Sequence, residues 1–433
     1  MPQRVLIVGA GFAGINCAKR LGNEKDVEVT VIDRRNHHLF QPLLYQVAMA
    51  GLSPADIAVP IRSLLSKFRN VRVVQAEMTG LHFDADGQGR VRAGDHDYPF
   101  DSLLLSAGAQ HAYFGHEDWE PLAPGLKNLE QATEIRRRVL SAFERAEETT
   151  DSNERRAALS FVVVGGGPTG VELAGALGEM SRFTLSRDFR SIDPKLTRVI
   201  LIEAGPRILP SFSAELSGRA TRDLERLGVQ VWTQSLVTGI TKDGVELAGE
   251  QIRASTVLWA AGVQASPTGA LTGAEQDRAG RVVVKDDLSL PAHPNVFVAG
   301  DQASVKSGLD GKFLPGVATV ALQQGVFVAK TILGDMKGKP RTDFRYWDKG
   351  QMATIGRRRA VLSSGKLELS GVLAWAAWLL VHIYYLTGFK NRLFVLIQWG
   401  YSYLTFARGA RLIVSKEWRS YRSRAAEVPP PAS

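Results

Sequence analysis

The chain has 433 residues, of which 45% are hydrophobic and 22% are charged, a balance typical of a globular protein with more than one domain. Its single cysteine, Cys17, excludes an intramolecular disulfide, a redox-active cysteine pair and a cysteine-based metal site, and we expect no metal. The net charge is +9, but nine Lys and Arg against three Glu follow residue 365, in the most apolar and aromatic part of the chain. We therefore expect no nucleic acid partner and a contact with an anionic membrane surface.

A glycine fingerprint follows the first predicted strand. The apolar run 5–8 leads into Gly9-Ala10-Gly11-Phe12-Ala13-Gly14, and a helical stretch comes next. In such a motif the first glycine permits a tight turn, the second lets the backbone approach a pyrophosphate, and the third lets the helix pack on the strand. The strand 27–32 ends at Asp33, 24 residues after Gly9, near the spacing at which a carboxylate accepts the ribose hydroxyls of an adenosine. The pattern predicts a dinucleotide at a helix N-terminus.

The sequence between this unit and the next is less specific. The loop 37–46 combines His37 and His38 with apolar and polar residues, and a strand at 102–106 ends at Ala107-Gly108. The charged stretch 130–156 predicts a solvated helix and a linker, to which we assign no chemistry.

A second fingerprint begins 156 residues after the first, where an apolar strand leads into Gly165-Gly166-Gly167-Pro168-Thr169-Gly170. The strand 198–202 leads into Glu203, 38 residues after Gly165, and this long gap predicts an insertion between residues 180 and 197. The unit closes at Ala260-Ala261-Gly262, which repeats the ending at 106–108. The halves look like duplicated modules that each hold one dinucleotide, and glycine turns of an ordinary α/β domain are the alternative at both places.

A further strand at 295–299 ends at Gly300-Asp301, and Pro315 with Gly316 predicts a loop that feeds a helix. If the strand returns to the first sheet, the second module is inserted into a discontinuous first domain. We therefore expect an α/β fold with two Rossmann-like dinucleotide-binding domains and a C-terminal amphipathic helical segment for membrane association. The predicted boundaries are 1–120 with 276–345 for the first domain, 121–275 for the second and 346–433 for the C-terminal region.

The C-terminal region is apolar, aromatic and basic. Residues 371–389 carry no charged side chain apart from a protonated form of His382, and by length they could span a bilayer. A polar stripe on one helical face follows, formed by Asn391, Gln398, Ser402, Thr405 and Arg408. We favour an amphipathic helix in the membrane plane, with a core or dimer helix and a true span as the alternatives.

The order of these parts resembles the type II NADH dehydrogenases, which are NADH:quinone oxidoreductases of the two-dinucleotide flavoprotein superfamily. The resemblance covers nearly the whole chain. It rests on both fingerprints, Asp33, the loop 42–48, the runs 170–172 and 203–210, Gly300-Asp301, the Gln-Gln-Gly at 323–325 and the basic aromatic tail.

By this resemblance, the first fingerprint binds FAD and the second binds NADH. The implied FAD contacts are Gly9, Ala10, Gly11, Phe12, Ala13, Gly14, Asp33, Arg34, His38, Leu43, Met78, Ala107, Gly108, Asp301, Ala318 and Thr319. The implied NADH contacts are Gly165, Gly167, Pro168, Thr169, Gly170, Glu203, Ala261 and Gly262. A carboxylate at Glu203 accepts ribose hydroxyls and repels the 2′-phosphate of NADPH, and Arg207 lies close enough in sequence to soften that preference.

The resemblance also implies a membrane quinone as electron acceptor, in contact with Gln46, Gln323, Gln324 and His382. The family often shows Ala-Gln-x-Ala-x-Gln where this chain has Thr319 in place of the first Gln, and the shorter side chain puts that quinone contact in doubt. Glu172 is the implied catalytic residue beside nicotinamide and flavin. A carboxylate that only stabilises the helix N-terminus is the alternative.

The implied activity is an FAD-dependent NADH:quinone oxidoreductase that passes a hydride to FAD and two electrons to the quinone. With no array of membrane helices, we expect no proton pumping. Without a predicted signal peptide, we expect a peripheral, monotopic protein on the inner leaflet, at the cytoplasmic face of the cell membrane, and we leave a homodimer open. A soluble ferredoxin or rubredoxin reductase and a non-catalytic nucleotide-binding redox sensor are the alternatives.

Overall fold

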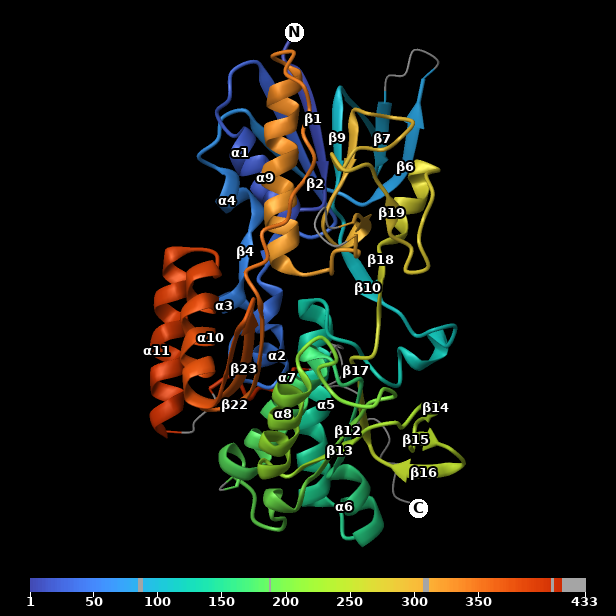
Figure 1. The fold of residues 1–433 in the computed structure, drawn as a ribbon. Coiled ribbons are helices and arrows are strands. Elements are labelled where there is room, and N and C mark those ends of the chain that lie inside the picture. The colour runs from blue at the N-terminus through green and yellow to red at the C-terminus, as the bar shows by residue number, and fades with distance from the viewer. Residues whose placement is uncertain (85–88, 187, 307–310, 406–408, 415–433) are drawn as a thin grey trace, which may run out of the picture.

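The computed structural model describes residues 1–84, 89–186, 188–306, 311–405 and 409–414. Two lobes lie one above the other in Figure 1, each built on a parallel sheet, and a pair of C-terminal helices stands beside the level at which the lobes meet. The architecture is α/β, as the sequence predicts.

The first lobe is built on a five-stranded sheet with the order β20-β9-β1-β2-β5. The strand bounds in that order are Val296–Val298, Ser102–Leu105, Gln3–Val8, Val27–Asp33 and Val71–Gln75. All neighbours are parallel, so the central strands are buried on both faces and show continuous apolar runs. Because β20 pairs with β9, the prediction that this strand returns to the first sheet is confirmed.

Two helices pack together against this sheet: α1 (Phe12–Leu21) and α9 (Ala318–Asp335). Figure 1 shows them side by side, although almost 300 residues separate them in sequence. A Cβ on Gly325 would lie 2.1 Å from the carbonyl oxygen of Ala13, so only glycine allows α9 to come this close to the start of α1. This contact places the first turn of α9 next to the first fingerprint.

The second lobe is built on a four-stranded parallel sheet with the order β13-β12-β11-β17. The strand bounds in that order are Val229–Trp232, Arg198–Ile202, Ser160–Val164 and Thr256–Trp259. Its helices are α5 (Leu129–Glu148), α6 (Ser152–Ala158), α7 (Pro168–Glu179) and α8 (Ala214–Arg226). The predicted solvated character of the stretch 130–156 is wrong for α5, because Ile135, Val139 and Phe143 lie in the core of this lobe.

A two-stranded antiparallel ribbon carries the chain between the lobes. It pairs β10 (Ala109–His111) on the way out with β18 (Val263–Ala265) on the way back. Tyr113 already packs with the strands of the second sheet, so the chain crosses before the predicted boundaries at 120 and 275. Those domain limits remain a prediction.

Smaller elements complete the lobes. The helices are α2 (Leu44–Ala48), α3 (Pro54–Ile57) and α4 (Ile61–Leu65). The strands of the first lobe are β3 (His37–Leu39), β4 (Ala58–Pro60), β6 (Met78–Phe83), β7 (Gly89–Ala93), β8 (His96–Phe100), β19 (Val282–Val283) and β21 (Ala303–Ser304). Those of the second lobe are β14 (Val237–Thr241), β15 (Gly244–Leu247) and β16 (Glu250–Arg253). The predicted insertion at 180–197 contains a five-residue π-helical turn, Met180–Thr184, and a short 3-10 turn, Pro194–Leu196.

The C-terminal region begins with a small sheet that the sequence did not reveal. Its antiparallel strands are β22 (Gln351–Gly356), β23 (Arg359–Ser364) and β24 (Leu367–Ser370). Helix α7 packs directly on β22, since a Cβ on Gly175 would lie 1.8 Å from the carbonyl oxygen of Ile355. The sheet therefore closes one side of the second nucleotide unit.

A helical hairpin of α10 (Gly371–Tyr385) and α11 (Phe389–Thr405) follows this sheet. Among the described residues, neither of these helices nor any other is both long and apolar enough to cross a membrane. Part of the polar stripe of α11 faces inward: Asn391 Nδ2 donates to Ala55 O at 3.3 Å, and Gln398 Nε2 donates to Gly51 O at 3.4 Å. The opposite, outer side carries exposed apolar side chains, among them Ile397 at 60% exposure. Arg408 and the residues beyond 414 lie outside the described part.

Candidate functional site

A cavity of about 1570 Å³ lies where the two lobes and the C-terminal region meet. Its wall combines residues of the first fingerprint, the start of α7, the first turn of α9, the small C-terminal sheet and α10. Segments from five distant parts of the sequence therefore share one space.

The first fingerprint has the geometry that its three glycines predict. Gly9 has φ +95°, and a Cβ there would lie 2.3 Å from Ser106 O, so only glycine can make this turn. A Cβ on Gly14 would lie 1.9 Å from Gly9 O, which shows that α1 packs directly on the end of β1. A Cβ on Gly11 would meet only Ser106 O, at 3.9 Å, and the backbone there is open to the cavity.

Asp33 fixes this turn from the end of β2. Its Oδ2 accepts the backbone N–H of Ala10 at 2.7 Å, and its Oδ1 accepts that of Arg35 at 2.7 Å. Most of the predicted FAD contacts line the cavity, namely Gly9, Ala10, Gly11, Phe12, Ala13, Asp33, Arg34, Met78, Ala107, Gly108, Asp301, Ala318 and Thr319. The cavity, the glycine cradle and the N-terminus of α1 together fit a long dinucleotide with its pyrophosphate at the helix end.

Three predicted FAD contacts do not line the cavity. Gly14 packs under the turn, as described above, and Leu43 is fully buried in the core. His38 Nδ1 lies 2.8 Å from Ala10 O, which makes it the donor of a hydrogen bond to the fingerprint backbone. Burial lowers the pKa of His38 to about 4, so this side chain is neutral and supports the cradle from behind.

The opposite wall of the cavity comes from the returning strand and α9. Asp301 stands in the short turn after β20, and its Oδ2 lies 3.4 Å from Lys127 Nζ. Gln324 Oε1 accepts the backbone N–H of Gly300 at 2.6 Å and so holds this turn against α9. The N-terminus of α9, at Ala318 and Thr319, faces the cavity, where the helix dipole favours negative charge.

The second fingerprint repeats the first almost atom for atom. Gly165 has φ +106°, and a Cβ on Gly170 would lie 1.8 Å from Gly165 O. Glu203 Oε2 accepts the backbone N–H of Gly166 at 2.7 Å, and its Oε1 accepts that of Gly205 at 2.6 Å. Of this set, Pro168 and Thr169 line the cavity, whereas Gly165, Gly167, Gly170, Glu203, Ala261 and Gly262 do not.

The pair Ala261-Gly262 follows β17 and lies under an aromatic ring. A Cβ on Gly262 would come within 2.4 Å of the Phe114 ring, which is 68% exposed. Phe114 also has φ +55°, in the left-handed region that a non-glycine residue seldom adopts. No motif in the sequence marks Phe114 as part of the second unit.

Glu172 lies in the first turns of α7, at the point where the second fingerprint reaches the cavity. Its side chain is half-buried between α7 and β22. Burial raises the pKa of its carboxyl from 4.5 to about 8, partly opposed by a hydrogen bond from the backbone of Thr354. At neutral pH the group is therefore mostly protonated and can both donate a hydrogen bond and release a proton.

Comparisons with known proteins agree with this geometry. A family model described as pyridine nucleotide-disulphide oxidoreductase matches residues 3–325. The type II NADH:quinone oxidoreductase Ndh of Mycobacterium tuberculosis is 42% identical over 96% of this chain and 91% of its own length. A second protein of that organism, NdhA, is 43% identical over 96% of this chain and 90% of its own.

The chain belongs to the type II NADH:quinone oxidoreductase family. Relatives from Staphylococcus aureus carry the same name at 32% identity over 83% of this chain and 89% of theirs. A solved structure of NDH2 from Plasmodium falciparum in complex with NADH matches with a TM-score of 0.85 and 19% identity, covering 96% of this chain and 100% of that one. At that identity the structural match shows the fold alone.

In this member of the family, the four predicted quinone contacts lie in different surroundings. His382 lines the cavity, its Nδ1 donates to Trp378 O at 2.7 Å, and burial lowers its pKa to about 4. Gln46 Oε1 accepts from Trp399 Nε1 at 2.8 Å and ties α2 to α11 away from the cavity. Gln324 is buried under the Gly300 turn, so both glutamines have protein partners, and their contact with a quinone remains a prediction. Gln323 lines a smaller hollow beside α9.

Several cavity residues were not predicted. Lys127 precedes α5, and Tyr346, Trp347 and Lys349 lie between α9 and β22. No motif marks these positions in the sequence, because isolated polar residues in connecting segments have no periodicity. Only the packing of those segments against the cavity identifies them.

Proposed function

We propose that this chain oxidises NADH and reduces a membrane quinone, with FAD held in the large cavity. The observation that carries the proposal is the convergence of both fingerprints on one space, with Glu172 at their junction. The relatives of 42% and 43% identity carry the name of this activity and match 96% of the chain. FAD, when bound, accepts a hydride from NADH and delivers two electrons to the acceptor.

The residues around the first fingerprint would hold FAD. The open backbone at Gly11 and the N-terminus of α1 suit the pyrophosphate, and Asp33 suits the adenosine ribose. Asp301 would hold the ribityl or pyrophosphate region. The dipole of α9 would stabilise negative charge on the reduced ring near Ala318 and Thr319.

NADH would enter on the side of the second fingerprint. Glu203 stands at the end of β12, where a carboxylate accepts ribose hydroxyls and repels a 2′-phosphate. Arg207 is the nearby cation, but its Nη2 donates to Pro210 O at 3.0 Å and to Phe212 O at 3.2 Å. Because these carbonyls hold the guanidinium, we infer that Arg207 softens the preference for NADH less than its position in sequence indicates.

Glu172 would act at the boundary between the NADH side and the flavin cavity. A protonated carboxyl there can orient a bound carboxamide by donating a hydrogen bond, and it can supply a proton when the acceptor is reduced. Disulfide chemistry has no part, because the chain has one cysteine and Cys17 is buried in α1.

We further propose that the outer face of the α10–α11 hairpin lies on a membrane. This face carries exposed apolar residues of both helices, namely Val372, Leu373, Leu380, Phe394, Leu396 and Ile397. Polar contacts tie the inner face to the protein, so the apolar side is left toward the surroundings, which is the arrangement of a helix pair lying in an interface. The inner leaflet, at the cytoplasmic face of the cell membrane, is the proposed location, and a homodimer over the same face is the competing occupant.

An anaerobic flavin titration tests the activity. Without oxygen, NADH added to the FAD-loaded protein should bleach the flavin absorbance, and a short-chain quinone should restore it. In a separate assay in air, NADH and the quinone together should give steady turnover. A protein that bleaches with NADH but does not reoxidise with quinone would fit a reductase of another acceptor. A protein that does not bleach would fit a nucleotide-binding sensor, and either result would overturn the proposal.

Vesicle binding tests the membrane face separately. Ile397→Glu should lower co-sedimentation with vesicles that contain anionic lipid, because a charge then replaces an exposed apolar side chain. Leu236→Glu is the matched control, since Leu236 is 66% exposed in the second lobe, away from the hairpin. Equal vesicle binding by both variants and the wild type would exclude this face as the membrane contact. Sedimentation of a stable dimer that Ile397→Glu dissociates would assign the face to a second copy instead.

A further inference from the structure

A short segment at 345–349 crosses the first turns of α9 on its way to β22. It is fastened by a reciprocal pair of hydrogen bonds with one side chain of that helix. Gln323 Nε2 donates to Trp347 O at 3.0 Å, and the backbone N–H of Trp347 donates to Gln323 Oε1 at 3.0 Å. Both ends of the Gln323 amide are therefore engaged by the backbone of this segment, so Gln323 positions it and offers little to a ligand.

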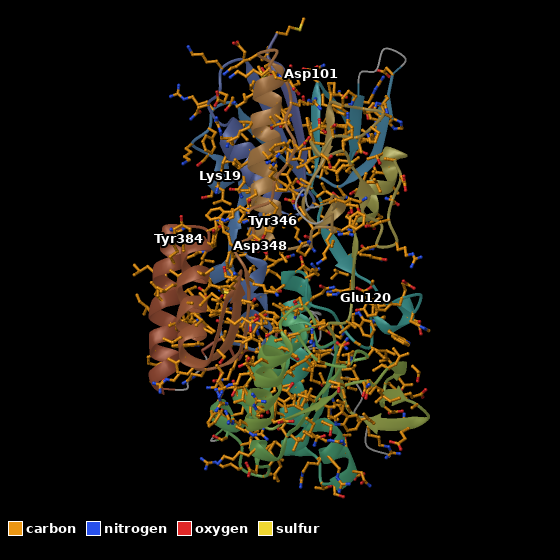
Figure 2. The ribbon with its side chains drawn as sticks, viewed as in Figure 1. Lys19, Asp101, Glu120, Tyr346, Asp348 and Tyr384 are labelled. Atoms are coloured by element: carbon orange, nitrogen blue, oxygen red, sulfur yellow. The ribbon has the colours of Figure 1, made fainter. Side chains whose placement is uncertain are left out.

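The same segment brings a phenol to the cavity. Tyr346 OH lies 2.9 Å from Thr319 Oγ1, and both residues line the cavity. The ring of Tyr346 packs against the core of the first lobe, and burial raises the pKa of its hydroxyl. Figure 2 shows Tyr346 and Asp348 close together near the N-terminal end of α9, between the two lobes.

The direction of the phenol proton follows from its neighbours, which are Thr319, Asp348 and the backbone N–H of Lys349. Asp348 Oδ1 lies 3.5 Å from Tyr346 OH, a long contact to a strong acceptor. When the phenol O–H of Tyr346 points toward Asp348, the Thr319 hydroxyl is the donor in its contact with the phenol oxygen. The Tyr346 O–H is then a donor held in place by Thr319 and only weakly engaged, so a ligand carbonyl in the cavity can replace the long contact.

A smaller hollow of about 370 Å³ lies beside α9, with Tyr385 of α10 among its lining residues. Thr319, Leu322, Lys349 and Tyr385 line both spaces. Lys349 Nζ donates to Tyr385 OH at 2.8 Å and so links the segment to α10. The large cavity also reaches α10 at Val381, His382 and Tyr385, so the phenol of Tyr346 and one helix of the hairpin line the same space.

From these contacts we propose that Tyr346 binds the quinone by donating its phenol O–H to one quinone carbonyl, with Thr319 orienting the phenol. The inference rests on the proposed NADH:quinone activity and names the donor at that site. It assigns to Thr319 a partner role in place of the direct contact that its short side chain cannot make. Gln323 acts one step further out, through the backbone of Trp347.

The test separates the quinone half-reaction from the NADH half-reaction in the FAD-loaded protein. Tyr346→Phe removes the donor and keeps the ring, so we expect kcat/KM for quinone to fall about tenfold, mainly through KM. Thr319→Val removes the orienting hydroxyl and should have a smaller effect in the same direction. In Tyr346→Phe, flavin bleaching by NADH and the FAD content should stay at the wild-type level.

A rescue variant distinguishes a donor from a merely structural tyrosine. In the double variant Thr319→Gln, Tyr346→Phe, the longer amide can supply an N–H to the same space, and quinone KM should recover at least in part. Tyr98→Phe is the control, because Tyr98 is a half-buried tyrosine on β8 that lines neither cavity.

The outcomes are separable. If the wild type reduces quinone and Tyr346→Phe has an unchanged quinone KM, Tyr346 is not the donor and the inference is overturned while the proposed function stands. A raised KM that Thr319→Gln fails to improve, together with slower NADH bleaching, would show that Tyr346 only holds the segment. If the wild type does not reduce quinone, the proposed function itself fails.

Discussion

The two glycine fingerprints have nearly the same local structure and very different surroundings. In both, the first glycine adopts a left-handed φ, the third lies against the carbonyl of the first, and an acidic residue accepts the N–H of the residue after the first glycine. The first fingerprint opens into the large cavity along most of its length. The second presents only Pro168 and Thr169 to that cavity.

Under the proposed function, this difference would separate a resident cofactor from a substrate. A ligand that contacts several walls of a cavity dissociates slowly, because many contacts must break together. A ligand bound on an open surface exchanges readily. The same backbone motif can therefore hold either a cofactor or a substrate, and the segments packed around the motif determine which of the two it holds. At the first fingerprint these segments are α9 and the turn at Asp301. At the second fingerprint, the small C-terminal sheet covers the entrance.

The largest expected effects come from matched substitutions of the third glycines. In Gly14→Ala and Gly170→Ala, the new Cβ would lie 1.9 Å and 1.8 Å from a backbone carbonyl oxygen, so helix and strand must separate. Each change should cost about 3 kcal/mol or more of folding free energy. We expect purified Gly14→Ala to lack flavin absorbance, and Gly170→Ala to keep flavin but lose saturable NADH binding.

Gly167→Ala is the control for this pair, since a Cβ there would meet nothing within 4 Å and φ is −70°. Its melting temperature should match the wild type, and any loss of NADH affinity then reports ligand approach rather than packing. Equal loss of FAD from Gly14→Ala and Gly170→Ala would contradict the division of tasks between the fingerprints.

Glu172→Gln should have the next largest effect, because an amide cannot release a proton. We expect NADH:quinone turnover to fall about tenfold or more at pH 7 with FAD content unchanged. Wild-type turnover should also fall as pH rises through about 8, where Glu172 ionises, and the variant should lack this step. Steady-state rates between pH 6 and 9 check both points, and wild-type turnover in the variant would remove Glu172 from the chemistry.

Stability gives an independent check of the same carboxyl. Its pKa is higher in the folded state than in the unfolded state, so the folded state binds the extra proton between about pH 4.5 and 8. Stability of the wild type relative to Glu172→Gln should therefore be greatest below pH 4.5, fall as pH rises to about 8, and change no further above it. Melting temperatures of the pair across this range measure the trend.

The smallest effect is expected at the open end of the second fingerprint. Glu203→Ala removes the charge that repels a 2′-phosphate, and the preference for NADH over NADPH should fall about tenfold. The ratio of the two kcat/KM values measures it. Glu225→Ala, an exposed carboxylate on α8, should leave the ratio unchanged, and an unchanged ratio in Glu203→Ala would count against the assignment of this strand end.

Prediction from the sequence was strongest where the backbone itself makes the site. Gly9, Gly14, Gly165 and Gly170 occupy positions that only glycine can fill, so their spacing carries the geometry directly. It was weakest for side chains whose role depends on a distant segment. Gln46, Gln323 and Gln324 have the amide chemistry of a quinone contact, yet each amide is occupied by a neighbour that the sequence does not reveal.

The sequence alone determined the two nucleotide units, their acidic strand ends and the absence of cysteine chemistry, because these follow from local spacing and from which atoms are present. Only the tertiary structure decided that α11 turns Asn391 and Gln398 inward, that β22 covers part of Glu172 and that Tyr346 reaches the cavity beside Thr319. These three features depend on packing between segments far apart in the chain. Burial sets the pKa of the Glu172 carboxyl, and hydrogen bonding sets the direction of the Tyr346 O–H. Both exist only after that packing has formed.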